Sequence, residues 1–307
     1  MFGNDDLPGF FYWKTGSMNV LQELLKRTPV ITDGAWGTQI QSLGLEAGGC
    51  PDAWNLINPA AVEQVARAYV EAGSRIVLTN TFGANRVMLE RHGLADKAVD
   101  LNRAGANLSR RAAGDKAFVF GSIGPAGRLL MMEEISREEL ADAFEEQASA
   151  LADGGVHGII VETMADLQEA RIAVAAAKET GLPVIASMVY DAGKELDRTM
   201  MGVTVEEAVA GLTDAGADVL GANCGMGVEF FENVTRRLRA ATTLPIWIKP
   251  NAGLPEMVGS DVVYKTTPDE FASYALGIRD AGAQFIGGCC GTTPDFIRAV
   301  VRRFGES

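Results

Sequence analysis

The chain has 307 residues, of which 47% are hydrophobic and 22% charged, a composition typical of a globular enzyme. Its 40 acidic and 27 basic side chains give a net charge of −13, which disfavours binding to nucleic-acid phosphates and to anionic membranes. No apolar run approaches the roughly 18 residues that span a bilayer, and no secretory signal precedes the first motif, so we expect a cytoplasmic protein.

The first 17 residues match neither a helix period nor a strand period. Gly16-Ser17-Met18 resembles a junction left by cloning, followed by a second start. We therefore predict an extension or added tail over residues 1–17. A single domain is predicted over residues 18–307.

Short, β-branched apolar runs alternate with longer helical patterns along this domain. The runs cover residues 30–32, 75–79, 117–120, 158–161, 183–187, 218–221, 245–248 and 284–287. Because the runs are nearly continuous in apolar character, they predict eight strands that are buried on both faces, as in a parallel sheet.

The intervening helices carry start and stop signals. Capping boxes, in which a Ser or Thr is followed three residues later by Glu, mark three helix starts. Their first residues are Ser136, Thr204 and Thr267. Four glycines follow helical patterns and are predicted to take the left-handed conformation that ends a helix. These are Gly73, Gly154, Gly216 and Gly282.

Eight strand-then-helix units in fewer than 300 residues predict an α/β fold, a single (βα)8 TIM barrel. An open, doubly wound sheet is the alternative. In either fold, ligands bind at the carboxyl ends of the strands, so the residues that follow each apolar run are the candidates for function.

Three of the four cysteines lie at predicted strand ends. Cys224 follows the sixth run, while Cys289 and Cys290 follow the eighth. Only one strand separates these ends in a barrel, and flanking glycines would let the backbone turn both adjacent thiols inward. Three thiolates suit a Zn²⁺ ion whose fourth position stays open, although free cysteines are also common as small buried residues. Cys50, in a Gly-Gly-Cys-Pro segment, is expected to be uninvolved.

The chemistry of such a site favours alkylation of a thiol. Three anionic sulfurs reduce the Lewis acidity of zinc, so a bound water would be a poor nucleophile, whereas a bound substrate thiol would stay deprotonated and reactive. A general base on the protein is then not required. Accordingly, His92 and His157 are expected to be structural or solvent-facing.

Six segments together resemble the homocysteine S-methyltransferase family over about Met18 to Phe304. They are DGAWGT at 33–38, TNTFGAN at 79–85, GSIGP at 121–125, ANCG at 222–225, PNAG at 250–253 and GGCCGTTP at 287–294. The resemblance implies a (βα)8 barrel in which Cys224, Cys289 and Cys290 hold zinc. Homocysteine thiolate then takes the open position, and the product is methionine.

The resemblance also implies how the amino-acid end of homocysteine is held. Asp33 and Glu162 match the acidic positions that bind the ammonium group in relatives, where backbone amides contribute as well. Asp33 has the alternative role of a loop residue that accepts backbone N–H groups, and Glu162 that of a structural residue. Further substrate contacts are expected from four residues, Gly34, Thr79, Ser122 and Asn223.

The methyl donor is a separate question, because members of this family use a methyl-corrinoid, betaine or a sulfonium compound such as S-methylmethionine. Animal betaine enzymes carry a Tyr where this chain has Gly83. With Gly83 at that position, the segments TNTFGAN and GGCCGTTP are more similar to the homocysteine module of cobalamin-dependent methionine synthases than to the animal betaine enzymes. We therefore expect methylcobalamin on a separate corrinoid protein as the donor.

Two alternatives stay open. The segment RTMMGVT at 198–204 resembles stand-alone bacterial betaine enzymes, and an aromatic cage for a quaternary ammonium group could be built from other residues. The candidates are Trp36, Trp54, Phe82 and Tyr190. A protein of another class, a non-catalytic zinc-binding subunit of a methyl-transfer complex, is the second alternative. A homo-oligomer is compatible with the sequence.

Overall fold

The structure is a computed structural model that describes residues 18–258 and 261–305. The tail predicted over residues 1–17 lies outside the described residues. Met18 begins the first described helix, α1 (Met18–Leu25).

Eight parallel strands form one sheet in the order β1-β10-β7-β6-β5-β4-β3-β2. They are β1 (Val30–Ile31), β2 (Ile76–Leu78), β3 (Phe118–Ile123), β4 (Gly158–Met164), β5 (Val184–Met188), β6 (Val219–Cys224), β7 (Ile246–Pro250) and β10 (Phe285–Ile286). A parallel bridge between Thr32 and Ile76 joins the two edges of this sheet. The sheet is therefore a closed barrel, which confirms the (βα)8 prediction and rules out the open sheet.

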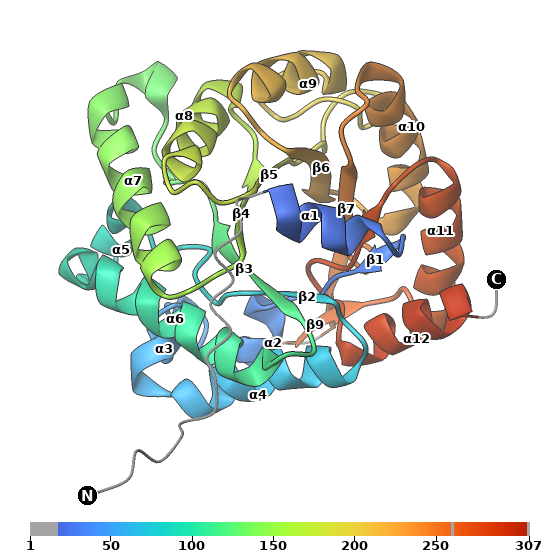
Figure 1. Cartoon of the computed structure of the whole chain (residues 1–307), viewed down its shortest axis with the longest axis horizontal. Coiled ribbons are helices and arrows are strands. Elements are labelled where there is room, and N and C mark those ends of the chain that lie inside the picture. The colour runs from blue at the N-terminus through green and yellow to red at the C-terminus, as the bar shows by residue number, and fades with distance from the viewer. Residues whose placement is uncertain (1–17, 259–260, 306–307) are drawn as a thin grey trace, which may run out of the picture.

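Helices surround the barrel on its outer face (Figure 1). After α1 they are α2 (Gly37–Ser42), α3 (Trp54–Ile57), α4 (Pro59–Glu71), α5 (Arg86–Glu90), α6 (Ala98–Ala113), α7 (Arg137–Asp153), α8 (Leu167–Lys178), α9 (Val205–Asp214), α10 (Phe231–Ala241), α11 (Pro268–Asp280) and α12 (Pro294–Gly305). Three short 3₁₀ turns lie in the connections, η1 (Ala95–Lys97), η2 (Leu130–Met132) and η3 (Val228–Phe230).

The predicted helix starts are confirmed, since α7, α9 and α11 each begin with a complete capping box. One of the four predicted stops is wrong. Gly73, Gly216 and Gly282 have positive φ, whereas Gly154 has φ −73° and stays right-handed. Its neighbour Gly155 takes the left-handed conformation at φ 81°. The two glycines are adjacent, and helix α7 continues one residue further than the sequence pattern indicated.

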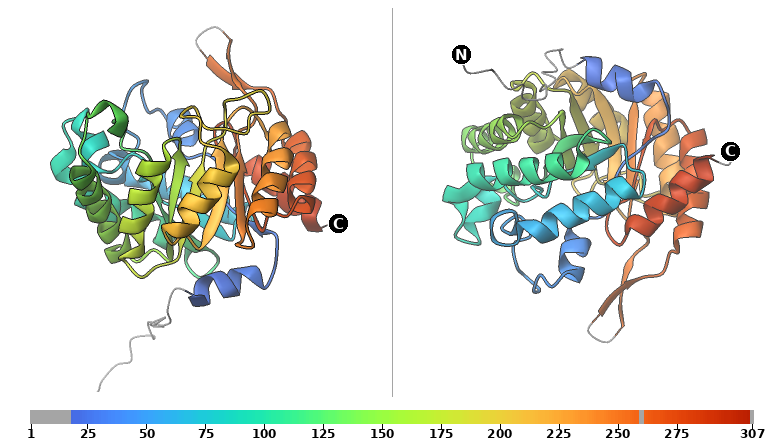
Figure 2. Two further views of the ribbon diagram at one scale, coloured as in Figure 1. Left: turned by 90° about the horizontal axis from the view of Figure 1, so that it is seen from above. Right: turned by 60° about the horizontal axis from the view of Figure 1, so that its bottom comes forward.

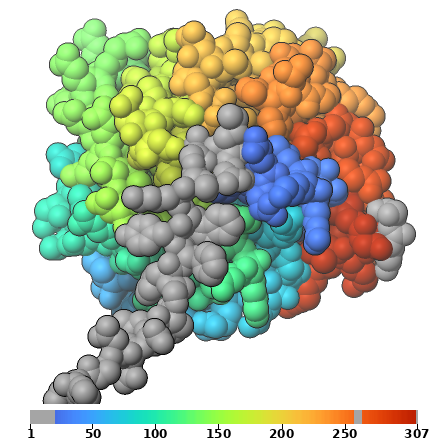
Figure 3. Space-filling model, in the orientation of Figure 1, coloured from blue at the N-terminus to red at the C-terminus, as the bar shows by residue number. Residues whose placement is uncertain are grey.

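Two apolar layers make up the core. The inner layer fills the barrel and consists of side chains from the strands, including Phe120, Ile160 and Trp247, and it also includes Leu21 and Leu24 of α1. Helix α1 thus packs against the amino-terminal end of the barrel, where it lies across the face shown in Figure 1 and Figure 3. The outer layer lies between the strands and the surrounding helices.

An antiparallel hairpin, β8 (Pro255–Val258) and β9 (Asp261–Tyr264), follows β7. It projects from the end of the barrel opposite α1 (Figure 2). The sequence pattern does not predict this hairpin. It places residues of the β7–α11 connection beside the carboxyl ends of the strands, where the candidate site lies.

Among the described residues, no helix is both long and apolar enough to cross a membrane.

Candidate metal centre

A layer of polar side chains lies next to the apolar interior of the barrel, on the side of the carboxyl ends of the strands. Side chains two residues apart on a strand point to the same face, so each inner-layer residue predicts the direction of the residue two positions later. Ser122 follows Phe120 in this way, Glu162 follows Ile160, and Lys249 follows Trp247. All three polar side chains are buried. The barrel therefore changes from apolar to charged at the level where the strands end.

Cys224, Cys289 and Cys290 lie together at these strand ends. Their Sγ atoms are all within 4.8 Å of one another, with 3.5 Å between Cys289 and Cys224 and 3.8 Å between Cys224 and Cys290. Tetrahedral zinc with Zn–S bonds of about 2.3 Å separates its sulfur ligands by ~3.8 Å. The donor type and the spacing both fit a three-thiolate zinc ion.

The backbone explains how adjacent cysteines turn to the same point. Strand β10 ends at Ile286, so Cys289 and Cys290 lie in the following loop, where the alternation of strand faces no longer applies. Gly291 completes that turn at φ 81°. Cys224, the last residue of β6, has φ 64°, an uncommon conformation for a residue with a side chain. Such a conformation costs free energy and is typical of functional sites.

The protonation of the cluster calls for a cation. Hydrogen bonds with Cys289 and Cys290, together with burial, raise the pKa of Cys224 far above that of a free thiol. Hydrogen bonds from Cys224 and Cys289 lower the pKa of Cys290 to about 3. Close negative charges repel one another, so a bound cation would favour the thiolate form of all three sulfurs.

Asp33 forms a buried ion pair that the sequence did not predict. Its Oδ1 lies 2.5 Å from Nζ of Lys249, and the two side chains are 0% and 2% exposed. Its Oδ2 accepts hydrogen bonds from Trp36 Nε1 at 2.8 Å and from the backbone N–H of Leu78 at 2.7 Å. Asp33 thus contacts protein donors on both oxygens, including a backbone N–H, as in the alternative role considered for it.

Glu162 has more of its acceptor capacity free. Among the described residues it accepts one hydrogen bond, from Ser122 Oγ to Oε1 at 2.6 Å, and it is 7% exposed. Burial raises the pKa of Glu162 to about 7, although the positive charge of Lys249 opposes this shift. A carboxylate in this environment gains from a cationic ligand, because a nearby positive charge favours its ionised form.

The other predicted substrate residues line the same region. Thr79 Oγ1 accepts from the Ser122 backbone N–H at 3.0 Å, which connects Thr79 to Glu162 through Ser122. Asn223 donates to Thr163 Oγ1 at 2.6 Å, and its Nδ2 lies 3.9 Å from Cys289 Sγ.

Gly34 is closely packed against neighbouring side chains. A Cβ atom there would lie 2.8 Å from Tyr69 and from Thr292, so the chain has no room for a larger residue.

Three residues of this region were not predicted from the sequence. Lys249 could have been found, because it lies two positions after Trp247 on the same strand face. Thr163 has φ 60° and binds Asn223 through both its backbone N–H and its hydroxyl, a conformation with no sequence signal. Tyr264 of the hairpin packs on Gly291. Burial, and to a smaller extent the charges of the three cysteines, raise the pKa of Tyr264 to about 12.

The residues expected to be uninvolved lie outside the cluster. Cys50 does not belong to the three-sulfur group, and its Sγ is 3.7 Å from Asp52 Oδ2. His92 is exposed. His157 accepts the Val119 backbone N–H through Nδ1 at 2.9 Å, which is a structural contact.

Most of the candidate cage aromatics serve other contacts. Trp54 and Tyr190 are buried in the outer apolar layer, and Trp36 donates to Asp33. Phe82 is exposed and packs beside Gly124. Of the four candidates, Phe82 has the most accessible ring.

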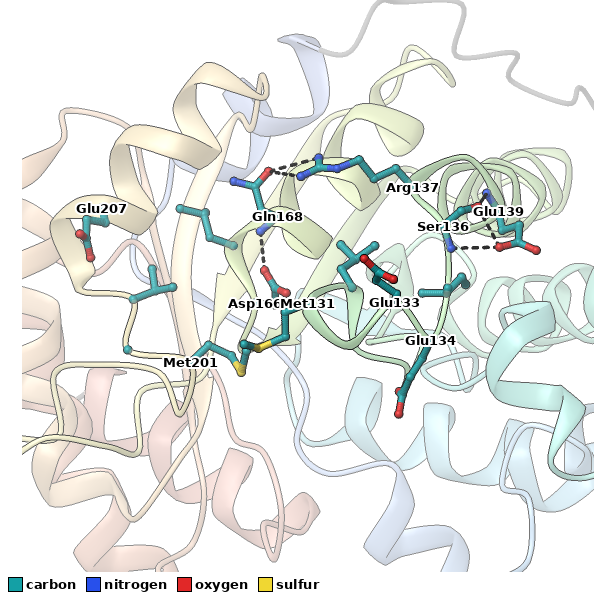
Figure 4. A pocket seen from close by; sticks show the side chains of 15 residues that line it. Met131, Glu133, Glu134, Ser136, Arg137, Glu139, Asp166, Gln168, Met201 and Glu207 are labelled. Carbon is teal, nitrogen blue, oxygen red and sulfur yellow. Dashed lines mark hydrogen bonds between the residues drawn. The ribbon is translucent and has the colours of Figure 1, made fainter.

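A cavity of about 960 Å³, whose lining residues include no cysteine, lies between the connections that follow β3, β4 and β5 (Figure 4). None of the predicted site residues lines it. Several of its polar side chains serve local contacts. Ser136 and Glu139 cap the start of α7, Asp166 caps the start of α8, and Arg137 pairs with Gln168. The cavity therefore shares no side chain with the three-sulfur cluster.

Comparison with known proteins connects this geometry to a family. The model of the homocysteine S-methyltransferase family matches residues 30–304. The methionine synthase of Mycobacterium leprae (strain TN) is 34% identical over 301 residues, which cover 91% of this chain and 24% of the relative. The methionine synthase of Mycobacterium tuberculosis (strain ATCC 25618 / H37Rv) is 33% identical and is covered to 25%. The chain thus spans about a quarter of the length of these relatives.

Solved structures show the same fold. The metallated form of the homocysteine methyltransferase MmuM from Escherichia coli superposes with a TM-score of 0.77 at 23% identity, over 93% of this chain and 99% of that chain. Its oxidized form gives a TM-score of 0.79 at 22% identity, over 94% and 100%.

Proposed function

The chain belongs to the homocysteine S-methyltransferase family, and we propose that it transfers a methyl group to the thiolate of homocysteine and so forms methionine. The observation that carries this proposal is the cluster of three sulfurs within 4.8 Å of one another at the carboxyl ends of the barrel strands. Three protein ligands leave one position of a tetrahedral zinc ion for a substrate, which distinguishes a catalytic site from a closed structural one.

Cys224, Cys289 and Cys290 would hold this zinc ion. Zinc bound there keeps a substrate thiol deprotonated and nucleophilic at neutral pH. In the transfer, a bond forms between the substrate sulfur and the methyl carbon, and the bond from that carbon to the donor breaks, its electron pair staying with the donor. Such a reaction needs no general base on the protein, which agrees with the structural contact of His157 and the exposed position of His92.

Glu162 is the residue that we propose for the substrate ammonium group. Its carboxylate is held by Ser122, which in turn is oriented by Thr79, so two of the predicted substrate residues act by positioning it. We assign Asn223 to the sulfur side of the site because it lies next to Cys289. Gly34 would contribute its backbone, and Asp33 would act mainly through its contact with Lys249.

For the donor, we propose methylcobalamin carried by a separate corrinoid protein. The support is the similarity to two methionine synthases, together with the glycine at position 83. A Cβ atom there would lie 2.9 Å from Asp52 Oδ2, so the Asp52 side chain would have to shift to admit a tyrosine like that of the animal betaine enzymes. Betaine and S-methylmethionine are the alternative donors, and a zinc-binding subunit without turnover is the alternative of another class.

Methionine formation tests this proposal. Zinc-loaded protein is incubated with homocysteine and, in separate reactions, methylcobalamin, betaine or S-methylmethionine. We expect turnover with methylcobalamin, whereas turnover with betaine alone would overturn the donor assignment. Cys289→Ala should lose zinc and activity together, and Cys50→Ala, the matched control, should keep both. Zinc retention without any binding of homocysteine would favour the non-catalytic subunit.

A further inference from the structure

Lys249 carries a buried positive charge in the centre of the site. It lies on β7, it is 2% exposed, and its Nζ contacts Asp33 Oδ1 at 2.5 Å. Burial by itself lowers the pKa of Lys249, but the negative charges of Asp33, Glu162 and Cys289 outweigh this effect and raise it. The contact with the Asp33 carboxylate identifies the side chain as an ammonium ion within a buried ion pair.

The hydrogen-bonding capacity of this ammonium group is only partly used. A lysine Nζ has three N–H donors. Within residues 18–258 and 261–305, the one hydrogen bond that it makes is to Asp33. The remaining donors lie in a buried environment, where an additional acceptor stabilises the charge.

The two carboxylates of the site thus differ in how far their negative charge is compensated by neighbouring groups. Asp33 is neutralised by Lys249, whereas Glu162 has one hydrogen-bond donor, the Ser122 hydroxyl, in the part of the chain that the structure describes. The amino-acid end of homocysteine is a zwitterion with an ammonium and a carboxylate on the same carbon. A site that offers a free carboxylate beside a cation with unused donors is complementary to both groups.

We propose that Lys249 binds the α-carboxylate of homocysteine, while Glu162 binds the α-ammonium group. This inference rests on the proposed function and deepens it, because it makes Lys249 a specificity-determining residue for the amino-acid end of the substrate. If Lys249 only stabilised Asp33 or balanced the charge of the sulfurs, its loss would affect every thiol substrate to the same extent.

The binding of two thiols distinguishes a carboxylate-binding role of Lys249 from a purely structural or charge-balancing one. One is homocysteine, and the other is the aminopropanethiol that is homocysteine without its carboxylate. Binding of each to the zinc-loaded protein is measured by titration calorimetry, which does not depend on a methyl donor. Because a charge-assisted hydrogen bond contributes about 1.5–3 kcal/mol, the wild-type protein should bind homocysteine about 10- to 100-fold more tightly than the aminopropanethiol.

In Lys249→Met this preference should fall to about threefold or less, mainly through weaker binding of homocysteine. Lys249→Arg, which keeps the charge, should restore part of the preference. Lys178→Met is the matched control, because Lys178 forms a partly buried pair with Asp218 at 2.8 Å, away from the site residues, and the preference should stay unchanged.

The double variant Asp33→Asn/Lys249→Met removes both charges of the pair and serves if the single variant does not fold. An unchanged preference in the Lys249 variants, or an equal loss for both thiols, would overturn the inference while leaving the proposed function intact. No binding of homocysteine by the zinc-loaded wild type would instead overturn the proposed function, and this inference with it.

Discussion

Individual residues of the site differ in how far their roles follow from residue type. Cys224 and Cys289 are 65 positions apart in sequence, yet their sulfurs lie 3.5 Å apart, as the order of strands in a barrel predicts. Glu162 and Ser122 were also predicted, and they form a direct hydrogen bond. The pairing of Asp33 with Lys249 was not, since a strand pattern says which face a side chain is on but not which partner it meets across a barrel.

Glu162 is testable by a neutral substitution. Glu162→Gln should weaken homocysteine binding by about 10- to 100-fold, because a charge-assisted contact with the ammonium group is lost. Binding of mercaptobutyrate, which is homocysteine without its amino group, should change little. Calorimetry on the zinc-loaded protein measures both.

The matched control is Glu169→Gln. Burial also raises the pKa of Glu169 to about 7, but its carboxylate accepts the Ala126 backbone N–H at 2.7 Å and was not assigned to the substrate. Equal effects of the two substitutions on homocysteine binding would contradict the role of Glu162.

At the scale of secondary-structure elements, the hairpin β8–β9 contributes to the site through Tyr264. Its ring packs on Gly291, where a Cβ atom would overlap it, and Gly291 has φ 81°. Gly291→Ala should therefore displace the loop of Cys289 and Cys290 and lower zinc retention after dialysis against a chelator. Gly93→Ala is the control, because Gly93 has φ 67° but open space around it. Equal zinc retention in both variants would show that the contact with Tyr264 is unimportant.

Helix capping gives a prediction about stability that is independent of the site. Thr267 begins α11 and accepts the Glu270 backbone N–H at 3.3 Å. Thr267→Ala should lower the free energy of unfolding by about 1 kcal/mol, since an orphan N–H group loses its partner. Ser273→Ala, on the exposed side of the same helix, should cost less in the same denaturant titration. A loss in Ser273→Ala as large as that in Thr267→Ala would contradict the assignment.

The elements show which local features the sequence encodes. Capping boxes depend on residues three positions apart, so all three were predictable. The hairpin depends on where the chain after β7 leaves the barrel, and its sequence, beginning at Pro255, has no strong alternation. The bend after β10 depends on packing as well, because Gly287 and Gly288 have neighbours that leave no space for a Cβ atom.

For the whole molecule, the eight strand-and-helix units were enough to predict a closed barrel, and the barrel was enough to predict that the cysteines meet. The electrostatic arrangement inside it was not predictable in the same way. It depends on long-range distances between buried charges, as in the Asp33–Lys249 pair, whose members are 216 positions apart.

The stability of the barrel should depend on pH through His157. Burial and the nearby Arg110 lower the pKa of His157 from 6.5 to about 4. In this window the unfolded chain binds more protons than the folded one, so stability is fully present above pH 6.5 and is lost as pH falls toward 4. Wild type should lose about 1–2 kcal/mol more than His157→Gln between pH 6.5 and pH 5. Parallel loss in both proteins, measured with guanidinium, would exclude His157 as the cause.

The most direct test of the account is X-ray absorption at the zinc edge, before and after homocysteine is added. We predict three sulfur ligands at about 2.3 Å and one lighter ligand in the protein alone, and four sulfur ligands once homocysteine is bound. Cys289→Ala should fail to give the three-sulfur spectrum. A wild-type spectrum in which the number of sulfur ligands stays the same on addition of homocysteine would contradict the claim that this centre binds the substrate thiolate.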